Sequence, residues 1–202
     1  CLLEWLHDWT TNRRQPVVLN GTESSWTDVL SSVVQGSVLG PILFVIYIND
    51  VDDTILAADN EIMVSKFADD TKIWRTITDM NDVAKLQSGI DNLVKWCQDW
   101  GMFLHPDKCV VLHFGHKNPR RDYYIGSSKI NSEDVARDLG VYVSVNCEPS
   151  KHIEKITKKA HGVLSQIRQA TIVRDSYTVA KLYTSYVRPL METAVPAWNP
   201  HK

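Results

Sequence analysis

Long hydrophobic runs are missing from this chain. The longest apolar stretch covers residues 42–48, whereas a helix that crosses a membrane needs about 20 apolar residues. We also find no signal-peptide pattern, internal repeat or low-complexity segment. These absences favour an ordinary globular chain over a membrane protein or a repeat array, and 202 residues allow one or two domains.

Cysteine is also scarce, and no two cysteines form a CxxC pair. The four are spread along the sequence: Cys1, Cys97, Cys109 and Cys147. This usage predicts no disulfide framework and favours a reducing, intracellular compartment, in the nucleus and/or the cytoplasm. A zinc site is the alternative, because several possible ligands lie close in the sequence: Cys97, His105, Cys109, His113 and His116. Their spacing matches no common zinc motif.

Charge is nearly balanced overall, with a net charge of −2, but it is unevenly distributed. Residues 1–101 carry 15 acidic and 7 basic side chains, whereas residues 150–202 carry 3 acidic and 9 basic ones. An acidic front part suits a metal site, and a basic end suits contact with a polyanion. A solvated basic helix is the alternative explanation of the basic end.

The most informative segment is Phe67-Ala68-Asp69-Asp70. Apolar stretches at 62–66 and 71–74 flank it, so the pattern predicts a β-hairpin with two carboxylates at its tip. Adjacent like charges repel, and a divalent cation would stabilise them. Turn formation alone is the alternative, since aspartate is common in turns.

Periodicity and turn residues predict the remaining elements. We expect helices over residues 1–11, from Pro41 to 48, from Asp79 or Asn81 to about Gly101, over 150–170 and over 175–187. We expect strands over 15–20 and 24–34 around a turn at Asn20-Gly21, then over 109–114, 123–125, 129–130 and 135–145. The helix over 42–48 is apolar on nearly all sides, which predicts a buried position.

Three motifs occur in a fixed order: QGSVLGP at 35–41, FADD at 67–70 and HPDKC at 105–109. With them, the chain resembles the reverse transcriptase domain of non-LTR retrotransposons of the jockey-like sort. The resemblance extends to Asn49-Asp50 and to the segments at 138–141 and 187–189.

The resemblance implies an α+β fold, with a right-hand polymerase palm followed by thumb-like helices. The palm would be an antiparallel sheet with helices on one face. The resemblance divides the chain into a partial palm at 1–148 and a thumb-like helical region at 149–202. It also implies RNA-directed DNA polymerase chemistry of the two-metal kind. The partners would be an RNA template, a DNA primer and deoxynucleotides, with no membrane.

The resemblance also assigns roles to residues. Asp69 and Asp70 would be the catalytic carboxylates that bind Mg²⁺ or Mn²⁺, with Asp69 as the main ligand and Asp70 as the supporting one. Lys108 would neutralise or protonate the leaving pyrophosphate. A solvated turn lysine is the alternative for Lys108.

Further roles concern the template and the primer. Gln35 would help to position the template base pair, and Gly36 would let the backbone approach the nucleic acid. A loop glycine that leads into a helix is the alternative for Gly36. Phe67 would lie beside the primer end, with a plain core role as the alternative. Leu139 and Gly140 fall where the family has its primer-gripping hairpin.

A basic stripe on the first thumb-like helix would follow a duplex backbone through phosphate contacts. Its residues are Lys151, Lys155, Lys158, Lys159 and Arg168.

One part of the family's catalytic set has no counterpart here. Right-hand polymerases use a further carboxylate from an earlier motif, and Asp8 and Asp28 are poor substitutes because one lies in a predicted helix and the other in a predicted hairpin. The chain begins with Cys1, so we expect a fragment, a processed product or a clipped chain.

Three hypotheses follow from this gap. The first is a polymerase fragment that is inactive as an isolated chain. The second is a non-catalytic remnant that binds RNA or an RNA–DNA duplex, and the third is a translated relic without a role.

Overall fold

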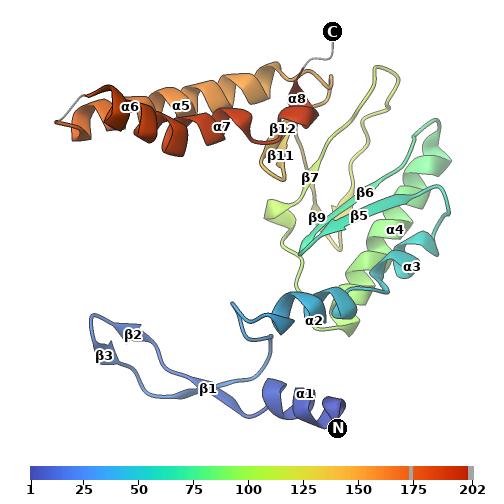
Figure 1. Ribbon diagram of the computed structural model, residues 1–202. Helices are drawn as coiled ribbons and strands as arrows, with labels where there is room; N and C mark the ends of the chain where they lie inside the picture. The colour runs from blue at the N-terminus through green and yellow to red at the C-terminus, as the bar shows by residue number, and fades with distance from the viewer. Residues whose placement is uncertain (173–174, 200–202) are drawn as a thin grey trace. The chain divides into compact units, whose positions relative to one another are not determined.

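The computed structural model describes residues 1–172 and 175–199 (Figure 1). They divide into two units, residues 1–75 and the described part of 76–202, so the predicted palm–thumb boundary after 148 lies inside the second unit. Mixed helices and strands confirm the α+β class. Among the described residues, no helix combines the length and apolarity that a membrane span requires.

The first unit begins with helix α1 (Leu2–Thr10) and a twisted ribbon, coloured blue in Figure 1. The ribbon pairs β1 (Arg13–Gln15) with β4 (Thr27–Val29), and β2 (Val18–Leu19) with β3 (Thr22–Glu23). Its turn is at Asn20-Gly21, as predicted, with φ values of 50° and 79° that suit a two-residue hairpin loop.

The predicted second strand is too long, because it ends at Val29 and not at Val34. The backbone changes direction at Ser32, which has a φ of 76°. The guanidinium of Arg13 donates a hydrogen bond to the Ser32 carbonyl. Pairing already stops at Val29, because its partner is Arg13 and the residues before Arg13 are Asn12, with a φ of 52°, and helix α1.

Helix α2 (Leu39–Tyr47) carries Pro41 in its first turn, as predicted, and a short helix α3 (Val51–Leu56) follows. The predicted burial of α2 is wrong. Ile42 is 54% exposed and Ile46 is 65% exposed, and only Gly40 is buried within the helix. The strands of this unit form two-stranded ribbons, which have too little surface to cover a helix on all sides.

The core of the first unit lies at the corner between α2 and α3 and at the start of the next strand. Its buried side chains are Ile48, Val51, Ile55 and Ile62. The predicted acidic hairpin follows directly, with β5 (Met63–Phe67) antiparallel to β6 (Asp70–Trp74). The hairpin therefore leaves the core at one end and carries its loop at the other.

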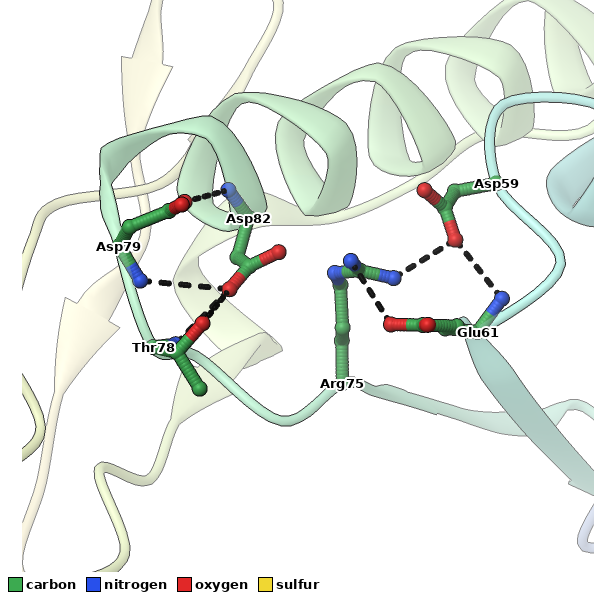
Figure 2. A network of polar contacts seen from close by, with 6 residues as sticks. All are labelled: Asp59, Glu61, Arg75, Thr78, Asp79 and Asp82. Carbon is green, nitrogen blue, oxygen red and sulfur yellow. Dashed lines mark hydrogen bonds and ion pairs between the residues drawn. The ribbon is translucent and has the colours of Figure 1, made fainter.

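The second unit begins with α4 (Met80–Asp99), the long helix predicted from the sequence. Asp79 caps it: its side chain accepts a hydrogen bond from the Asp82 amide, and the Asp82 carboxylate accepts one from the Asp79 amide (Figure 2). Gly101, with a φ of 68°, ends the helix in a Schellman motif. Both predicted boundaries are thus confirmed.

The strands of the second unit are short. After the 3₁₀ turn η1 (Pro106–Lys108), β7 (Val110–Val111) runs parallel to β10 (Asn131–Ser132). The hairpin of β8 (Tyr124–Ile125) and β9 (Ser128–Lys129) confirms the two short strands predicted over 123–125 and 129–130, to within one residue at each bound. Strand β7 is shorter than the predicted 109–114, because it gains only a two-residue partner.

The predicted single strand over 135–145 is wrong. The structure has a hairpin there, in which β11 (Val135–Asp138) pairs antiparallel with β12 (Val141–Ser144). The turn residues Leu139 and Gly140 both have positive φ, 45° and 89°, which reverses the chain. In the described residues all strands pair two by two, so a continuous antiparallel sheet is not formed.

The chain ends in helices. Helix α5 (Ser150–Ala170) has the predicted bounds, and α6 (Ser176–Leu182), a π-helical segment η2 (Tyr183–Val187) and α7 (Arg188–Glu192) return along it (Figure 1). The helix predicted to end at Val187 continues, because Pro189 lies at the start of α7, where a missing N–H costs little. A final turn is α8 (Val195–Trp198).

His152 joins three of these elements and gives the second unit a pH dependence. The residue is 1% exposed, and the centre of its ring lies 5.5 Å from that of Trp198. Its Nδ1 accepts a hydrogen bond of 3.2 Å from the Tyr142 amide. An acceptor nitrogen must be unprotonated, and burial lowers the pKa of His152. The neutral ring therefore belongs to the folded state.

We expect His152 to leave the free energy of unfolding unchanged at pH values above the ordinary histidine pKa of about 6.5, and to lower it as the pH drops below that value. The reason is that the unfolded chain then binds protons that the folded chain excludes. Urea unfolding at pH 7 and pH 5 checks this, and His152→Gln should show a smaller difference. Burial also lowers the pKa of His113, so His113 adds to the pH dependence of every variant. The contribution of His152 is therefore the difference between the wild type and His152→Gln. The control is His161→Gln, which replaces an exposed histidine on the same helix and should behave as the wild type does.

Candidate metal site and nucleic-acid interface

The two aspartates lie at the tip of the β5–β6 hairpin. Phe67 pairs with Asp70, and Ala68-Asp69 forms the two-residue loop between them. Ala68 has a φ of 52°, the positive value that such a loop requires at its first position. Five consecutive residue pairs hold the two strands in register. The sequence thus places adjacent carboxylates where the chain reverses.

Both carboxylates face solvent. Asp69 and Asp70 are exposed, and in the described part of the chain neither side-chain carboxylate has a hydrogen-bonding or ionic partner. Phe67, beside them, is 62% exposed, so its predicted alternative as a core residue is not what the structure shows. Carboxylate oxygens are hard ligands, and Mg²⁺ binds through one or two of them while keeping several waters. The donor set fits such an ion.

The tip alone does not form a closed cage. Across residues 1–172 and 175–199, no group of three or more histidine, cysteine, aspartate or glutamate side chains has metal-binding geometry. The possible zinc ligands between Cys97 and His116 therefore do not come together. Burial raises the pKa of the Cys97 and Cys109 thiols, which opposes the thiolate form that zinc binds.

A buried arginine holds the base of the hairpin. The Arg75 side chain is 2% exposed, and its guanidinium lies 2.6 Å from an Asp59 carboxylate oxygen and 3.0 Å from one of Glu61 (Figure 2). The same Asp59 oxygen accepts a hydrogen bond of 2.7 Å from the Glu61 amide. This network joins the end of β6 to the loop before β5, so it fixes where the hairpin leaves the core.

Gln35 and Gly36 form the turn that precedes α2. Gly36 has a φ of 77°, and nothing lies within 4 Å of the position that a Cβ would take. The backbone there is open to an approaching molecule. Ser37 then fixes the start of the helix, because its hydroxyl donates to the Val34 carbonyl and accepts from the Gly40 amide. The Gln35 side chain is exposed.

Three predicted site residues belong to turns of the second unit. Lys108 is exposed at the end of η1, in the predicted turn. Leu139 and Gly140 form the loop of the β11–β12 hairpin, and the Leu139 side chain is 51% exposed. Leucine is unfavourable in this position for two reasons. At positive φ its Cβ is close to backbone atoms, and its apolar side chain is exposed to solvent.

The predicted basic residues all lie on α5 and are exposed. At 3.6 residues per turn, Lys151, Lys155 and Lys158 fall within about 60° of one another, and Lys159 adjoins them. Arg168 lies about 100° away from Lys151 around the helix and is outside this stripe. Of the two buried side chains of the helix, Ala160 lies opposite Lys151, and His152 lies beside the edge of the stripe at Lys159. The exposed lysine stripe is thus continuous over two to three turns.

Two of these lysines make short-range contacts. The Lys151 ammonium lies 3.4 Å from a Glu154 carboxylate oxygen, and both side chains are exposed. The Lys155 ammonium lies 5.9 Å from the centre of the Tyr142 ring. Exposed pairs of this kind contribute little to stability, so the lysines can exchange them for phosphate contacts.

Comparison with known proteins identifies the family of this chain. The family described as "Reverse transcriptase (RNA-dependent DNA polymerase)" matches residues 2–146, which is more than half of the chain. The chain therefore belongs to the reverse transcriptase family, as the motifs predicted.

Its similar proteins come from mobile elements. The chain is 23% identical over 208 residues to the "RNA-directed DNA polymerase from mobile element jockey" of Drosophila funebris, covering 98% of this chain and 22% of that protein. It is 21% identical over 183 residues to the jockey protein of Drosophila melanogaster, covering 87% and 20%. It is 23% identical over 199 residues to the "Probable RNA-directed DNA polymerase from transposon X-element" of Drosophila melanogaster, covering 96% and 21%.

The predicted resemblance to jockey-like elements is confirmed by these matches. The chain spans about one fifth of the length of these curated relatives. No solved structure matches the chain.

Proposed function

We propose that this chain is part of an RNA-directed DNA polymerase, with Asp69 and Asp70 as ligands of its catalytic Mg²⁺ or Mn²⁺. The observation that carries the proposal is a pair of exposed carboxylates at a tight hairpin tip in a chain of the reverse transcriptase family. Among the described residues, these carboxylates have no hydrogen-bonding or ionic partner. The reaction joins a deoxynucleotide to a DNA primer on an RNA template. The divalent ions, when bound, stabilise the attacking and leaving oxygens.

The chain's own residues orient the reactants. The open backbone at Gly36 admits the template strand, and the exposed Gln35 amide contacts its base pair. The exposed Phe67 ring offers a surface on which the primer end packs. Lys108 supplies a positive charge for the leaving pyrophosphate, and Leu139-Gly140 contacts the primer backbone.

We assign residues 1–148 to a partial palm and residues 149–202 to a thumb-like region. The lysine stripe on α5 would then hold the duplex through its phosphates. A duplex-binding remnant without catalysis is the second candidate, and the exposure of all four stripe lysines favours it. The two candidates differ in whether the hairpin tip binds metal.

Metal binding at the tip tests the proposal. We expect the chain to bind Mn²⁺, and we expect Asp69→Asn combined with Asp70→Asn to weaken the affinity roughly 30-fold, because two of the charges that attract the cation are removed. Isothermal titration or electron paramagnetic resonance measures this. Asp8→Asn, which removes an exposed aspartate elsewhere in the same unit, is the matched control and should leave the affinity unchanged.

Equal Mn²⁺ affinity in the double variant and the wild type would contradict the proposal. The isolated chain should show no Mg²⁺-dependent primer extension, since two carboxylates do not complete the family's metal site. Nucleotide incorporation that disappears in Asp69→Ala would show that the chain is catalytically complete after all.

A further inference from the structure

A lysine occupies an inward-facing position on the strand that leads to the acidic loop. Along β5, Ser65 and Phe67 are exposed, whereas Val64 and Lys66 are half-buried. The Lys66 side chain is 18% exposed. Lysine is rarely enclosed unless it is paired, because the charged form loses its hydration. Its contacts therefore indicate what it does.

The Lys66 ammonium makes two contacts at the corner between α2 and α3. It donates a hydrogen bond of 2.8 Å to the Ile48 carbonyl, and it lies 3.0 Å from a carboxylate oxygen of Asp52. Ile48 is the C-terminal cap of α2, where carbonyls lack helical partners and a cation is favourable. Asp52 lies in the first turn of α3.

Asp52 depends on this lysine. Its second carboxylate oxygen is buried and has no hydrogen-bonding partner among the described residues. Without Lys66, a partly enclosed carboxylate would be left without its counter-ion, which is costly. The lysine and the corner therefore hold each other in place, and the strand that carries Lys66 is held with them. Helix α3 packs on β5 beside this contact.

The position along the hairpin is what gives the contact a role. Lys66 pairs with Thr71 and is one pair away from the closing pair of Phe67 and Asp70. Asp69 is three residues further on, in the loop where the chain reverses. A two-stranded ribbon is only marginally rigid by itself. Arg75 fixes its base, and Lys66 is the corresponding anchor near its tip.

We propose that Lys66 is a positioning residue that anchors the β5 strand to the α2–α3 corner close to the hairpin tip, so that Asp69 and Asp70 keep a fixed position for a divalent cation. This inference rests on the proposed function for the metal itself. It assigns to a residue outside the acidic motif the task of fixing the geometry of that motif.

The sign of the effect on metal affinity separates positioning from simple charge. Lys66→Met keeps the aliphatic stem and removes one positive charge. Through electrostatics alone, that change would strengthen the binding of a cation nearby, because it removes a repulsion. A positioning role predicts the opposite. We expect Lys66→Met to bind Mn²⁺ about fivefold more weakly, a loss below the tenfold or more found when residues that orient metal ligands are replaced.

Two further variants complete the test. Lys66→Arg keeps the charge and the donors and should bind Mn²⁺ as the wild type does. Lys72→Met removes the same charge from the same hairpin and should not weaken binding. Unchanged or tighter Mn²⁺ binding in Lys66→Met would overturn the inference. If that variant fails to fold, as judged by circular dichroism, Lys66→Gln is measured instead under the same criterion.

A second readout separates this inference from the proposed function. Amide hydrogen exchange at Phe67 and Asp70, measured without metal, should be several-fold faster in Lys66→Met than in Lys72→Met. If wild-type Mn²⁺ binding proves independent of Asp69 and Asp70, the metal proposal is wrong, and the exchange rates alone decide whether Lys66 holds the tip. Equal rates in the two variants would then refute the inference.

Discussion

Arg75→Met is expected to lower the free energy of unfolding of the first unit by about 3–5 kcal/mol, the usual cost of removing one partner from a buried ion pair. The Arg75 side chain is 2% exposed and that of Asp59 is 10% exposed, with 2.6 Å between their charged atoms. Methionine fills similar space but leaves the Asp59 carboxylate enclosed without its cation. The link between the end of β6 and the loop before β5 would then be lost.

Urea unfolding followed by circular dichroism measures this effect. Arg14→Met is the matched control, because Arg14 forms a 3.0 Å ion pair with Asp28 in which both side chains are more than half exposed. It should cost less than about 1 kcal/mol. Adding Asp59→Leu to Arg75→Met should recover much of the loss, since the uncompensated charge is removed. Similar losses for Arg75→Met and Arg14→Met would show that burial of the pair contributes nothing.

Reversing the charge of three lysines on α5 should nearly abolish duplex binding. We expect the combination of Lys151→Glu, Lys155→Glu and Lys158→Glu to weaken affinity for an RNA–DNA duplex on the order of 100-fold at low salt. Three phosphate contacts are lost and replaced by repulsion. The dependence of log affinity on log salt should also become less steep, by about 3.

Fluorescence anisotropy with a labelled duplex at several salt concentrations measures both quantities. A control chain carries the same change in net charge at exposed lysines elsewhere: Lys95→Glu, Lys117→Glu and Lys181→Glu. It should lose much less affinity and keep the steeper salt dependence. An equal loss in both chains would mean that net charge, and not the α5 stripe, governs binding.

Local patterns allowed much of this fold to be predicted. The acidic hairpin follows from apolar flanks and a two-residue loop, and α4 from its aspartate cap and terminal glycine. The bounds of α5 were predicted as well, because Pro149 begins it and its apolar period runs without interruption. These signals all act within a few residues, where the sequence alone determines the outcome.

Tertiary features were predicted less well. The exposure of α2 was missed because apolar composition indicates what a helix prefers to cover, not whether enough surface exists to cover it. Periodicity missed the turn at Leu139-Gly140 within a predicted strand, because leucine rarely takes positive φ, whereas the family resemblance had indicated a hairpin at these two residues.

The two candidate metal ligands and the basic side chains of α5 could be proposed from the sequence, but the residues that hold the hairpin could not. Arg75 and Asp59 are 16 positions apart, and Lys66 and Ile48 are 18 apart. Nothing in their local sequence joins them. One signal was present: Lys66 stands at the inward position of an alternating strand, where a lysine requires a partner.

The β5–β6 ribbon has a further consequence for how this chain behaves in concentrated solution. Among the described residues neither strand has a second neighbour, so each offers a row of backbone donors and acceptors to other copies. Two such ribbons placed side by side with their loops at the same end would bring four tip carboxylates close together. Their mutual repulsion, at its strongest in the absence of divalent ions, would oppose edge-to-edge pairing in that orientation.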